Sequence, residues 1–352
     1  MSGTDLTDSL REAVAAANAS SAPLRVRGGG SKDFFGRRAV GQPLAVTDHR
    51  GILAYEPSEL VITARAGTRL AEIESTLTVH RQLLPFEPPC FGDTATLGGT
   101  IACGLSGPRR PYAGATRDFV LGVQVINGRG EILRFGGQVM KNVAGYDVSR
   151  LMTGALGTLG VLLEVSVKVL PAPAAEVTLV QEMDGGLAIE TMNRLAGQPL
   201  PLSAACHLDR RLYVRLSGSA SGVRAAGETL GGEAAPNDFW ARLREHDLPF
   251  FAGDAPLWRL SVPPAHPPLA LPGTWVLDWG GAQRWLRTGA NSAAVRAAAA
   301  AAGGHATLFR GGDRDSEVFQ PLPTGVAGLH RRLKTAFDPN GILNPGRYYP
   351  DL

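Results

Sequence analysis

Residues suited to holding a large anionic ligand are concentrated in one stretch of the chain, residues 94–118. Glycines in this stretch remove Cβ atoms, so the backbone can adopt positive φ or pass close to a flat ring system. Hydroxyl and guanidinium donors suit diphosphate oxygens. The glycines are Gly98, Gly99, Gly104, Gly107 and Gly114; the donors are Thr94, Thr96, Thr100, Ser106, Thr116, Arg109, Arg110 and Arg117. We predict a cofactor site here, although the same pattern also fits a glycine-rich loop of an ordinary α/β protein.

A second glycine cluster, Gly28-Gly29-Gly30-Ser31, directly follows a predicted strand at Leu24–Arg27. Successive backbone N–H groups in such a turn can form a concave anion site, to which Ser31 would add a hydroxyl. A plain glycine turn is the simpler alternative. Neither cluster has the strand, Gly-x-Gly-x-x-Gly and helix order of a Rossmann site, and the Walker lysine motif is absent as well.

The bulk composition is that of a globular protein. The chain has 352 residues, 44% of them hydrophobic and 19% charged, with a formal net charge of +3. This charge is small and dispersed, which argues against nucleic acid as a partner. The three cysteines form no CxxC pair, so we predict no metal site in this chain and a reducing compartment. Residues 1–22 lack the apolar core of a signal peptide, and no apolar run reaches bilayer length. We therefore expect a cytoplasmic location, with membrane contact only peripheral or through a partner.

The pattern of predicted elements changes at Pro171-Ala-Pro173, where we place a domain boundary. The segments before it alternate short strands with helices, one of which we expect Thr68 to cap. The segments after it predict an antiparallel sheet with helices on one face, an α+β cap. The strands predicted before the boundary include Ile52–Tyr55, Leu60–Ala64, Leu83–Phe86, Val120–Ile126 and Val161–Leu170. Asn127-Gly128 predicts a hairpin turn, after which Glu131–Phe135 returns as a strand. Asp147 is either the N-cap of the helix predicted at Asp147–Thr153 or the end of a segment, Lys141–Asp147, that positions this helix against a ligand.

Candidates for acid–base chemistry are few. His305 and Arg310 begin and end one predicted strand, so His305 could act as a base and Arg310 could bind a substrate carboxylate. A surface histidine and a solvated arginine are the simpler interpretation, because no carboxylate partner for the histidine is evident. In the turn-rich tail, Asn344 either belongs to a helix termination or places its amide beside a cofactor.

Taken together, these motifs resemble the FAD-binding fold of the vanillyl-alcohol oxidase superfamily, the PCMH-type fold. The matching segments are Arg27–Ser31, Thr96–Gly99 with Gly107 and Gly114–Asp118, Gly145–Leu151 with Gly157–Val161, and Asp338–Arg347. More narrowly, residues 106–112, 135–152 and 304–310 are similar to the FAD-binding subunit family of bacterial glycolate oxidase. The chain departs from the wider pattern at Ala102–Gly107 and at Leu156, which puts single contacts in question.

The resemblance implies an α+β protein. A PCMH-type FAD-binding domain of two α/β subdomains would span residues 1–172, an inserted antiparallel-sheet cap 173–323, and a C-terminal return to the FAD domain 324–352. FAD would be bound without a covalent link, because Ser31 stands where tethered relatives carry histidine. The residues expected to bind FAD are Arg27, Gly28, Gly29, Gly30, Ser31, Thr96, Leu97, Gly98, Gly99, Gly107, Gly114, Thr116, Arg117, Asp118, Gly160, Val161 and Asn344.

The implied function is that of an oxidoreductase subunit. Larger catalytic relatives carry a His-Gly-x-Gly-Asn-x-His metal motif in the cap, and this chain has none. The resemblance therefore implies that this chain acts together with a larger FAD subunit and an iron–sulfur subunit. The implied reaction is the oxidation of a small 2-hydroxy acid, such as glycolate to glyoxylate. The alternatives are a self-sufficient FAD-dependent 2-hydroxy-acid dehydrogenase and a flavin-fold scaffold or binding subunit without chemistry of its own.

Overall fold

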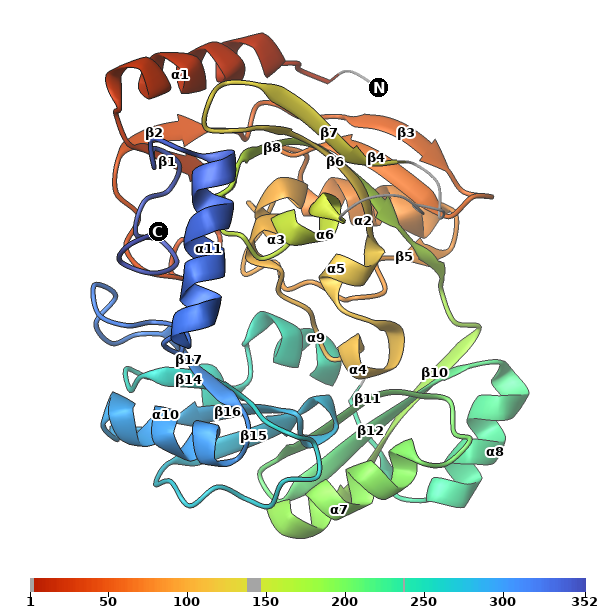
Figure 1. Cartoon of the computed structure of the whole chain (residues 1–352). Helices are drawn as coiled ribbons and strands as arrows, with labels where there is room; N and C mark the ends of the chain where they lie inside the picture. Colours follow the sequence, from red (N-terminus) through yellow and green to blue (C-terminus); the bar gives the residue numbers. More distant parts are fainter. Residues whose placement is uncertain (1–2, 138–146, 237) are drawn as a thin grey trace. The chain divides into compact units, whose positions relative to one another are not determined.

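The computed structural model describes residues 3–137, 147–236 and 238–352, and the chain divides into two compact units (Figure 1). The first unit comprises Met1–Leu105, Ala115–Pro171 and Arg314–Leu352, and the second comprises Ser106–Gly114 and Ala172–Asp313. Three segments of the sequence thus form the first unit, and the two segments between them, residues 106–114 and 172–313, form the second. The return to this unit starts at Arg314, ahead of the boundary expected from the sequence at residue 324.

A five-stranded antiparallel sheet in the order β3-β4-β8-β6-β7 forms the centre of the first unit. The middle strand, β8, lies between β4 and β6 and is buried at six of its eight positions, which include the β-branched Val161, Val165 and Val167. The β6–β7 hairpin predicted from the sequence is confirmed. The side-chain oxygen of Asn127 accepts hydrogen bonds from the backbone N–H groups of Arg129 and Glu131 and closes its loop. The sheet strands are β3 (Ile52–Glu56), β4 (Val61–Arg65), β6 (Val120–Ile126), β7 (Ile132–Gly136) and β8 (Val161–Lys168).

The other elements of the first unit surround this sheet. A parallel pair, β1 (Leu24–Arg27) with β2 (Gln42–Ala45), extends toward the tail, where Leu24 forms a parallel bridge with Leu343. A short pair joins β5 (Gln82–Leu83) to β9 (Leu170–Pro171). The helices are α1 (Thr7–Ser20), α2 (Leu70–Val79), α3 (Leu97–Cys103), α5 (Thr116–Phe119), α6 (Val148–Met152) and α11 (Thr324–Phe337).

Three local expectations have distinct outcomes. Thr68 does not cap α2, whose N-cap is Arg69. The Thr68 hydroxyl is instead engaged with the backbone N–H and carbonyl of Gly51, so it is not available to the helix. The strand predicted at Leu83–Phe86 is confined to Gln82–Leu83. Asp147 caps α6 as predicted, accepting a hydrogen bond from the Arg150 backbone N–H, whereas Gly145 and Tyr146 lie outside the described residues.

The second unit is built on an eight-stranded antiparallel sheet in the order β13-β10-β12-β11-β15-β16-β14-β17. Helices α7 and α8 cover one face with a core that includes Ile189, Met192 and Val214, which confirms the predicted α+β cap. The strands are β10 (Ala175–Glu182), β11 (Leu202–Leu208), β12 (Arg211–Gly218), β13 (Glu233–Ala234), β14 (Leu257–Ser261), β15 (Thr274–Asp278), β16 (Gln283–Arg287) and β17 (His305–Arg310). The helices are α4 (Arg110–Ala113), α7 (Gly185–Ala196), α8 (Ala220–Leu230), α9 (Phe239–Glu245) and α10 (Ser292–Ala301).

Candidate functional site

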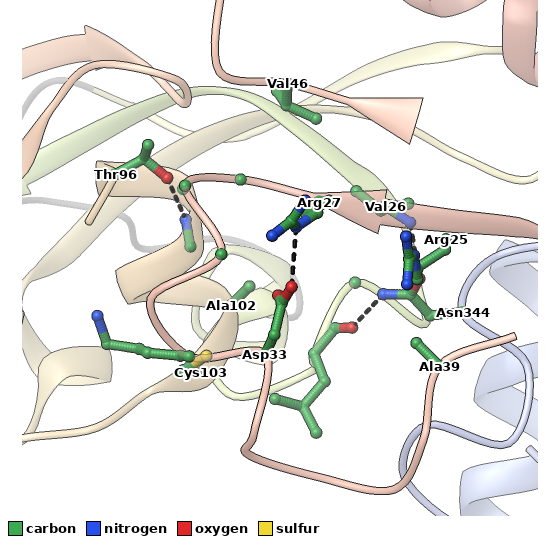
Figure 2. A pocket seen from close by; sticks show the side chains of 18 of the residues that line it. Arg25, Val26, Arg27, Asp33, Ala39, Val46, Thr96, Ala102, Cys103 and Asn344 are labelled. Atoms are coloured by element: carbon green, nitrogen blue, oxygen red, sulfur yellow. Dashed lines mark hydrogen bonds and ion pairs between the residues drawn. The ribbon is translucent and has the colours of Figure 1, made fainter. Parts of the chain in front are cut away.

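A cavity of about 230 Å³ lies in the first unit, where the end of β1, helix α3, the segment before β8 and the tail converge (Figure 2). Segments separated by more than 300 residues in the sequence therefore line one space. Ten of the residues expected to bind the cofactor line it: Arg27, Gly28, Gly29, Gly30, Ser31, Thr96, Gly98, Gly99, Gly160 and Asn344.

The loop after β1 offers this cavity a set of free backbone donors. Within the described part of the chain, no hydrogen bond engages the backbone N–H groups of Gly28, Gly29, Gly30 or Ser31. Unpaired backbone donors at a partly buried position are uncommon unless a ligand or water satisfies them. Consecutive free N–H groups are suited to the oxygens of a phosphate group.

Three positions around the cavity require or favour glycine for different physical reasons. A Cβ at Gly29 would lie 1.5 Å from the carbonyl oxygen of Thr94, so close approach of two backbone segments requires this residue. A Cβ at Gly98 would lie 2.6 Å from the Cβ of Ala66, so this glycine serves helix packing. A Cβ at Gly99 would have one neighbour within 4 Å outside the backbone of its own helix, the Thr96 hydroxyl at 3.1 Å, and Gly99 borders the cavity. Gly99 thus keeps space open on the cavity side of α3.

The start of α3 is not a donor site for a ligand. The Thr96 hydroxyl accepts a hydrogen bond from the Gly99 backbone N–H at 3.2 Å. The N–H groups of Leu97 and Gly98 donate to the carbonyls of Thr68 and Ala66 at 2.9 and 2.8 Å. These protein partners satisfy the first N–H groups of the helix. The free donors of the cavity are therefore on the glycine loop.

The lining of the cavity is strongly cationic. Its one carboxylate, Asp33, is paired with Arg27 at 2.8 Å, with both side chains about half exposed. The Nε atom of Arg25 is buried and has no hydrogen-bond partner in the described structure. Burial also lowers the pKa of Arg347. The basic side chains of the lining are Arg25, Arg27, Lys32, Arg38 and Arg347. Such an excess of positive charge favours a polyanionic ligand.

Asn344 borders the cavity, but both ends of its amide are engaged by the protein. Its Oδ1 accepts a hydrogen bond from the Val26 backbone N–H at 2.7 Å, and its Nδ2 donates to the Leu156 carbonyl at 2.6 Å. The side chain is 4% exposed. Asn344 thus joins β1 to the segment before β8, and its amide orients the cavity wall.

Seven residues expected to bind the cofactor do not line the cavity: Leu97, Gly107, Gly114, Thr116, Arg117, Asp118 and Val161. Leu97 and Val161 are fully buried in the core. The Thr116 hydroxyl donates to the Leu105 carbonyl at 2.8 Å, and the Asp118 carboxylate accepts from the Ala115 N–H at 2.9 Å. Direct contact between these seven residues and a cofactor stays a prediction.

Several lining residues were not among the expected cofactor ligands, including Asp33, Arg38, Cys103 and Arg347. Cys103 is the last residue of α3, and burial raises the pKa of its thiol. Arg347 closes the Asn-Pro-Gly-Arg run of the tail, which is the one sequence signal that could have identified it.

His305 and Arg310 are the first and last residues of β17 in the second unit. Five steps along an extended strand place their Cα atoms roughly 16 Å apart. A base and a carboxylate ligand for one two-carbon acid need to be closer than this, so the strand does not bring them together. Neither residue lines the cavity described above, and their catalytic roles stay predictions.

No group of three or more His, Cys, Asp or Glu side chains in residues 3–137, 147–236 and 238–352 could hold a metal ion. In the same residues, none of the helices combines the length and the hydropathy that crossing a bilayer requires.

Comparison with known families identifies two segments of the chain. Residues 5–136 match the FAD binding domain family, and residues 322–348 match the C-terminal domain of FAD linked oxidases. Apart from residues 106–114, which belong to the second unit, both segments lie within the unit that contains the cavity. The chain is also similar in fold to 4-ethylphenol oxidase from Gulosibacter chungangensis, with a TM-score of 0.71, 15% identity and coverage of 98% of this chain and 88% of that one.

Three sequence relatives differ in how much of their length is shared. D-lactate dehydrogenase of Anaerostipes hadrus is 33% identical over 140 residues, 40% of this chain and 29% of that protein. Glycolate oxidase subunit GlcD of Bacillus subtilis (strain 168) is 35% identical over 129 residues, 37% of this chain and 27% of that protein. Glycolate oxidase subunit GlcE of Escherichia coli (strain K12) is 49% identical over 348 residues, which is 99% of both chains. Because this last similarity extends over nearly the whole of each chain, the protein belongs to the GlcE family of glycolate oxidase subunits, within the FAD-linked oxidases.

Proposed function

We propose that this chain binds FAD non-covalently in the cavity of the first unit and works as a flavin subunit of a complex that oxidises glycolate, or a similar 2-hydroxy acid, to the 2-oxo acid. The observation that carries the proposal is the loop Gly28–Ser31, whose free backbone N–H groups border a cavity with a cationic lining. The family of the chain supports the assignment of FAD as the ligand.

In this proposal the residues of the chain bind and orient the cofactor. The glycine loop and the buried Arg25 Nε would donate hydrogen bonds to the diphosphate. Gly99 leaves space for a planar ring beside α3, and Asn344 keeps the wall of the cavity in place. When bound, FAD supplies the acceptor for the two electrons of the hydroxy acid.

We assign abstraction of the substrate proton to a partner, the larger FAD subunit of the complex. The candidate base, His305, and the candidate for binding the substrate carboxylate, Arg310, lie at opposite ends of a strand, whereas proton abstraction needs a base within hydrogen-bond reach of the bound substrate. Onward electron transfer needs an iron–sulfur subunit, because the three cysteines of this chain are fewer than the four that a cluster of the common types requires.

The complex would be located in the cytoplasm, with peripheral contact at the inner face of the membrane.

The first test is the absorbance spectrum of the purified chain. Bound flavin gives two visible bands, and a colourless protein that does not take up added FAD would contradict the proposal. The second test compares dye-linked glycolate oxidation by the flavin-loaded chain and by the co-expressed complex. We expect activity in the complex and little in the isolated chain. Equal specific activities would favour a self-sufficient dehydrogenase, in which His305 becomes the leading candidate for the base.

A further inference from the structure

A short segment between two glycines forms part of the cavity wall. Gly36 and Gly41 adopt φ values of 92° and 110°, which favour glycine, and between them Arg38 and Ala39 line the cavity. Figure 2 shows Ala39 in this position. We call residues 36–41 the strap. The residue just before it, Phe35, is fixed by packing, because it is 4% exposed and its ring lies 5.7 Å from that of Phe319.

The strap itself buries little apolar surface. The Arg38 side chain is exposed, and Val40 is 58% exposed. A segment without apolar burial is held by hydrogen bonds, each of which contributes little net free energy because water can replace it. Such segments open more readily than packed ones. Glycines in positive φ at both ends are also suited to absorb the backbone rotation of a hinge.

The first attachment of the strap is to residues 314–316, where the chain returns from the second unit. The Arg314 guanidinium donates to the Gly36 carbonyl at 2.6 Å through Nη2, and the Arg38 backbone N–H donates to the Arg314 carbonyl at 3.2 Å. Arg38 also pairs with Asp315 at 3.0 Å. Burial, followed by the nearby charge of Arg347, lowers the pKa of Arg314 to about 10, so the guanidinium stays charged at neutral pH.

The second attachment is to the tail. The Arg37 backbone N–H donates to the Arg347 carbonyl at 2.9 Å, and Nη1 of Arg347 donates to the Arg37 carbonyl at 2.7 Å. The Arg37 side chain reaches the carbonyl of Gly346 at 3.0 Å. The tail attachment involves Arg347, which itself lines the cavity, whereas Arg314 and Asp315 do not. The attachment to residues 314 and 315 can therefore be removed without changing the cavity lining.

We propose that the strap is a gate over the cofactor cavity and that its attachment to Arg314 and Asp315 sets the rate at which FAD enters and leaves. That the ligand is FAD rests on the proposed function, whereas the opening of the strap is independent of that function. Arg314 and Asp315 act as positioning residues through the strap. Arg314 directly follows Asp313, the last residue of the second unit. The chain arriving from β17 is thus connected to the gate without an intervening element.

The first experiment measures the rate of FAD release by the recovery of flavin fluorescence after mixing with an excess of a competing apoflavoprotein. Arg314→Ala, which removes a partly buried charge-assisted hydrogen bond, should release FAD about tenfold or more faster than wild type. Asp315→Asn removes an exposed ion pair and should accelerate release by no more than about fivefold. Arg134→Gln is the control, because Arg134 pairs with Glu164 at 3.7 Å on the same unit and is not part of the strap or the cavity.

The second experiment needs no flavin and reports on the gate alone. Cys103 lines the cavity and Cys206 is fully buried, so in a Cys90→Ser background the rate of thiol labelling reports access to Cys103. Arg314→Ala should accelerate labelling of the cofactor-free protein by a factor similar to that for FAD release, and saturating FAD should suppress labelling. If Arg314→Ala does not fold, Arg314→Lys and Asp315→Asn replace it.

The outcomes separate the two hypotheses. A wild-type protein that takes up no FAD would contradict the proposed function, and the labelling rates would still test the strap. Equal labelling rates in wild type and in a folded Arg314 variant would overturn the gate, even if FAD binds. Faster labelling in Arg134→Gln as well would also overturn it, because the effect would then not be specific to the strap.

Discussion

The side chain of Asn344 accepts a hydrogen bond from the backbone N–H of Val26 at 2.7 Å, although 318 residues separate them. The strand that leads into the glycine loop is therefore held at its outer side by the tail of the chain. The carbonyl of Leu24 accepts a further bond from the Asn344 backbone N–H at 2.9 Å. The geometry of the cavity thus depends on a residue whose amide binds the protein at both ends.

We predict that Asn344→Ala destabilises the protein by about 1–3 kcal/mol, because it leaves a buried N–H and a buried carbonyl without partners. Flavin affinity should fall as well, since β1 and the Leu156 segment lose their link. Urea unfolding and flavin titration check both effects. The matched control is Asn340→Ala, an exposed asparagine of the same tail that bonds to Asn18. Equal effects of the two substitutions would contradict the assigned role of Asn344.

Neighbouring glycines of α3 should give opposite results. Gly99→Val places a side chain toward the cavity and should abolish flavin binding, while the free energy of unfolding changes by less than about 1 kcal/mol. Gly98→Ala drives a Cβ against Ala66 and should destabilise the fold by about 1–3 kcal/mol. Flavin content and chemical denaturation of both variants distinguish the two sites. Wild-type flavin content in Gly99→Val would remove Gly99 from the site.

Stability should fall as the pH drops below about 6.5, the ordinary pKa of histidine. Burial, with a smaller effect from Arg65, lowers the pKa of the fully buried His49, although Asp5 opposes the shift. The unfolded chain therefore takes up the proton first, and protonation favours unfolding. His49 Nδ1 also accepts a hydrogen bond from the Leu6 N–H at 3.1 Å, which a protonated ring cannot do.

The free energy of unfolding of wild type and His49→Gln, measured between pH 5 and 8, checks this expectation. The variant should be less stable at pH 8, and its stability should depend less on pH. The difference between the two proteins should shrink as the pH falls from 6.5 toward the lowered pKa of His49. A constant difference across the range would show that His49 does not carry the pH dependence.

Flavin bound by this chain should be released completely by acid or heat denaturation. Ser31 has no ring nitrogen that could be linked to the isoalloxazine, and none of the seven histidines lines the cavity among the described residues. After precipitation, the yellow colour should appear in the supernatant. Colour retained on the precipitate would indicate a covalent bond, for which Cys103 would be the first residue to examine by peptide mass analysis.

The sequence was most informative where local signals determine structure. Asn127 closes the β6–β7 hairpin through its own side chain, and Asp147 caps α6 in the predicted way, because both effects act over four residues or fewer. The sequence also predicted the glycine loop as part of the cofactor site, since the glycines and the strand that precedes them are adjacent in the chain. The prediction that Thr68 caps α2 was wrong because the Thr68 hydroxyl is hydrogen-bonded to Gly51. That contact depends on how another loop packs.

The remaining features of the site depend on contacts between distant segments. Arg38 and Arg347 reach the cavity only after the tail has paired with the strap, and no periodicity in the sequence reports that pairing. The sequence likewise does not show that both ends of the Asn344 amide are hydrogen-bonded, because the partners are the distant residues Val26 and Leu156. The seven expected ligands that do not line the cavity belong to the same sequence motifs as residues that do or follow them in the chain, and membership of a motif does not distinguish a ligand from a residue that supports one.

The pairing of Leu24 with residues 342–344 has a consequence for how the protein is made. During synthesis the glycine loop leaves the ribosome early, but its supporting segment follows only after some 300 further residues. The second unit is nearly continuous in sequence and can fold in the interval, since domains generally fold as units while the chain grows. We therefore expect the cavity wall to close last, by a contact of high sequence separation. Cofactor loading would then follow translation, and a ribosome stalled before Asn344 should carry a nascent chain whose binding site is still open.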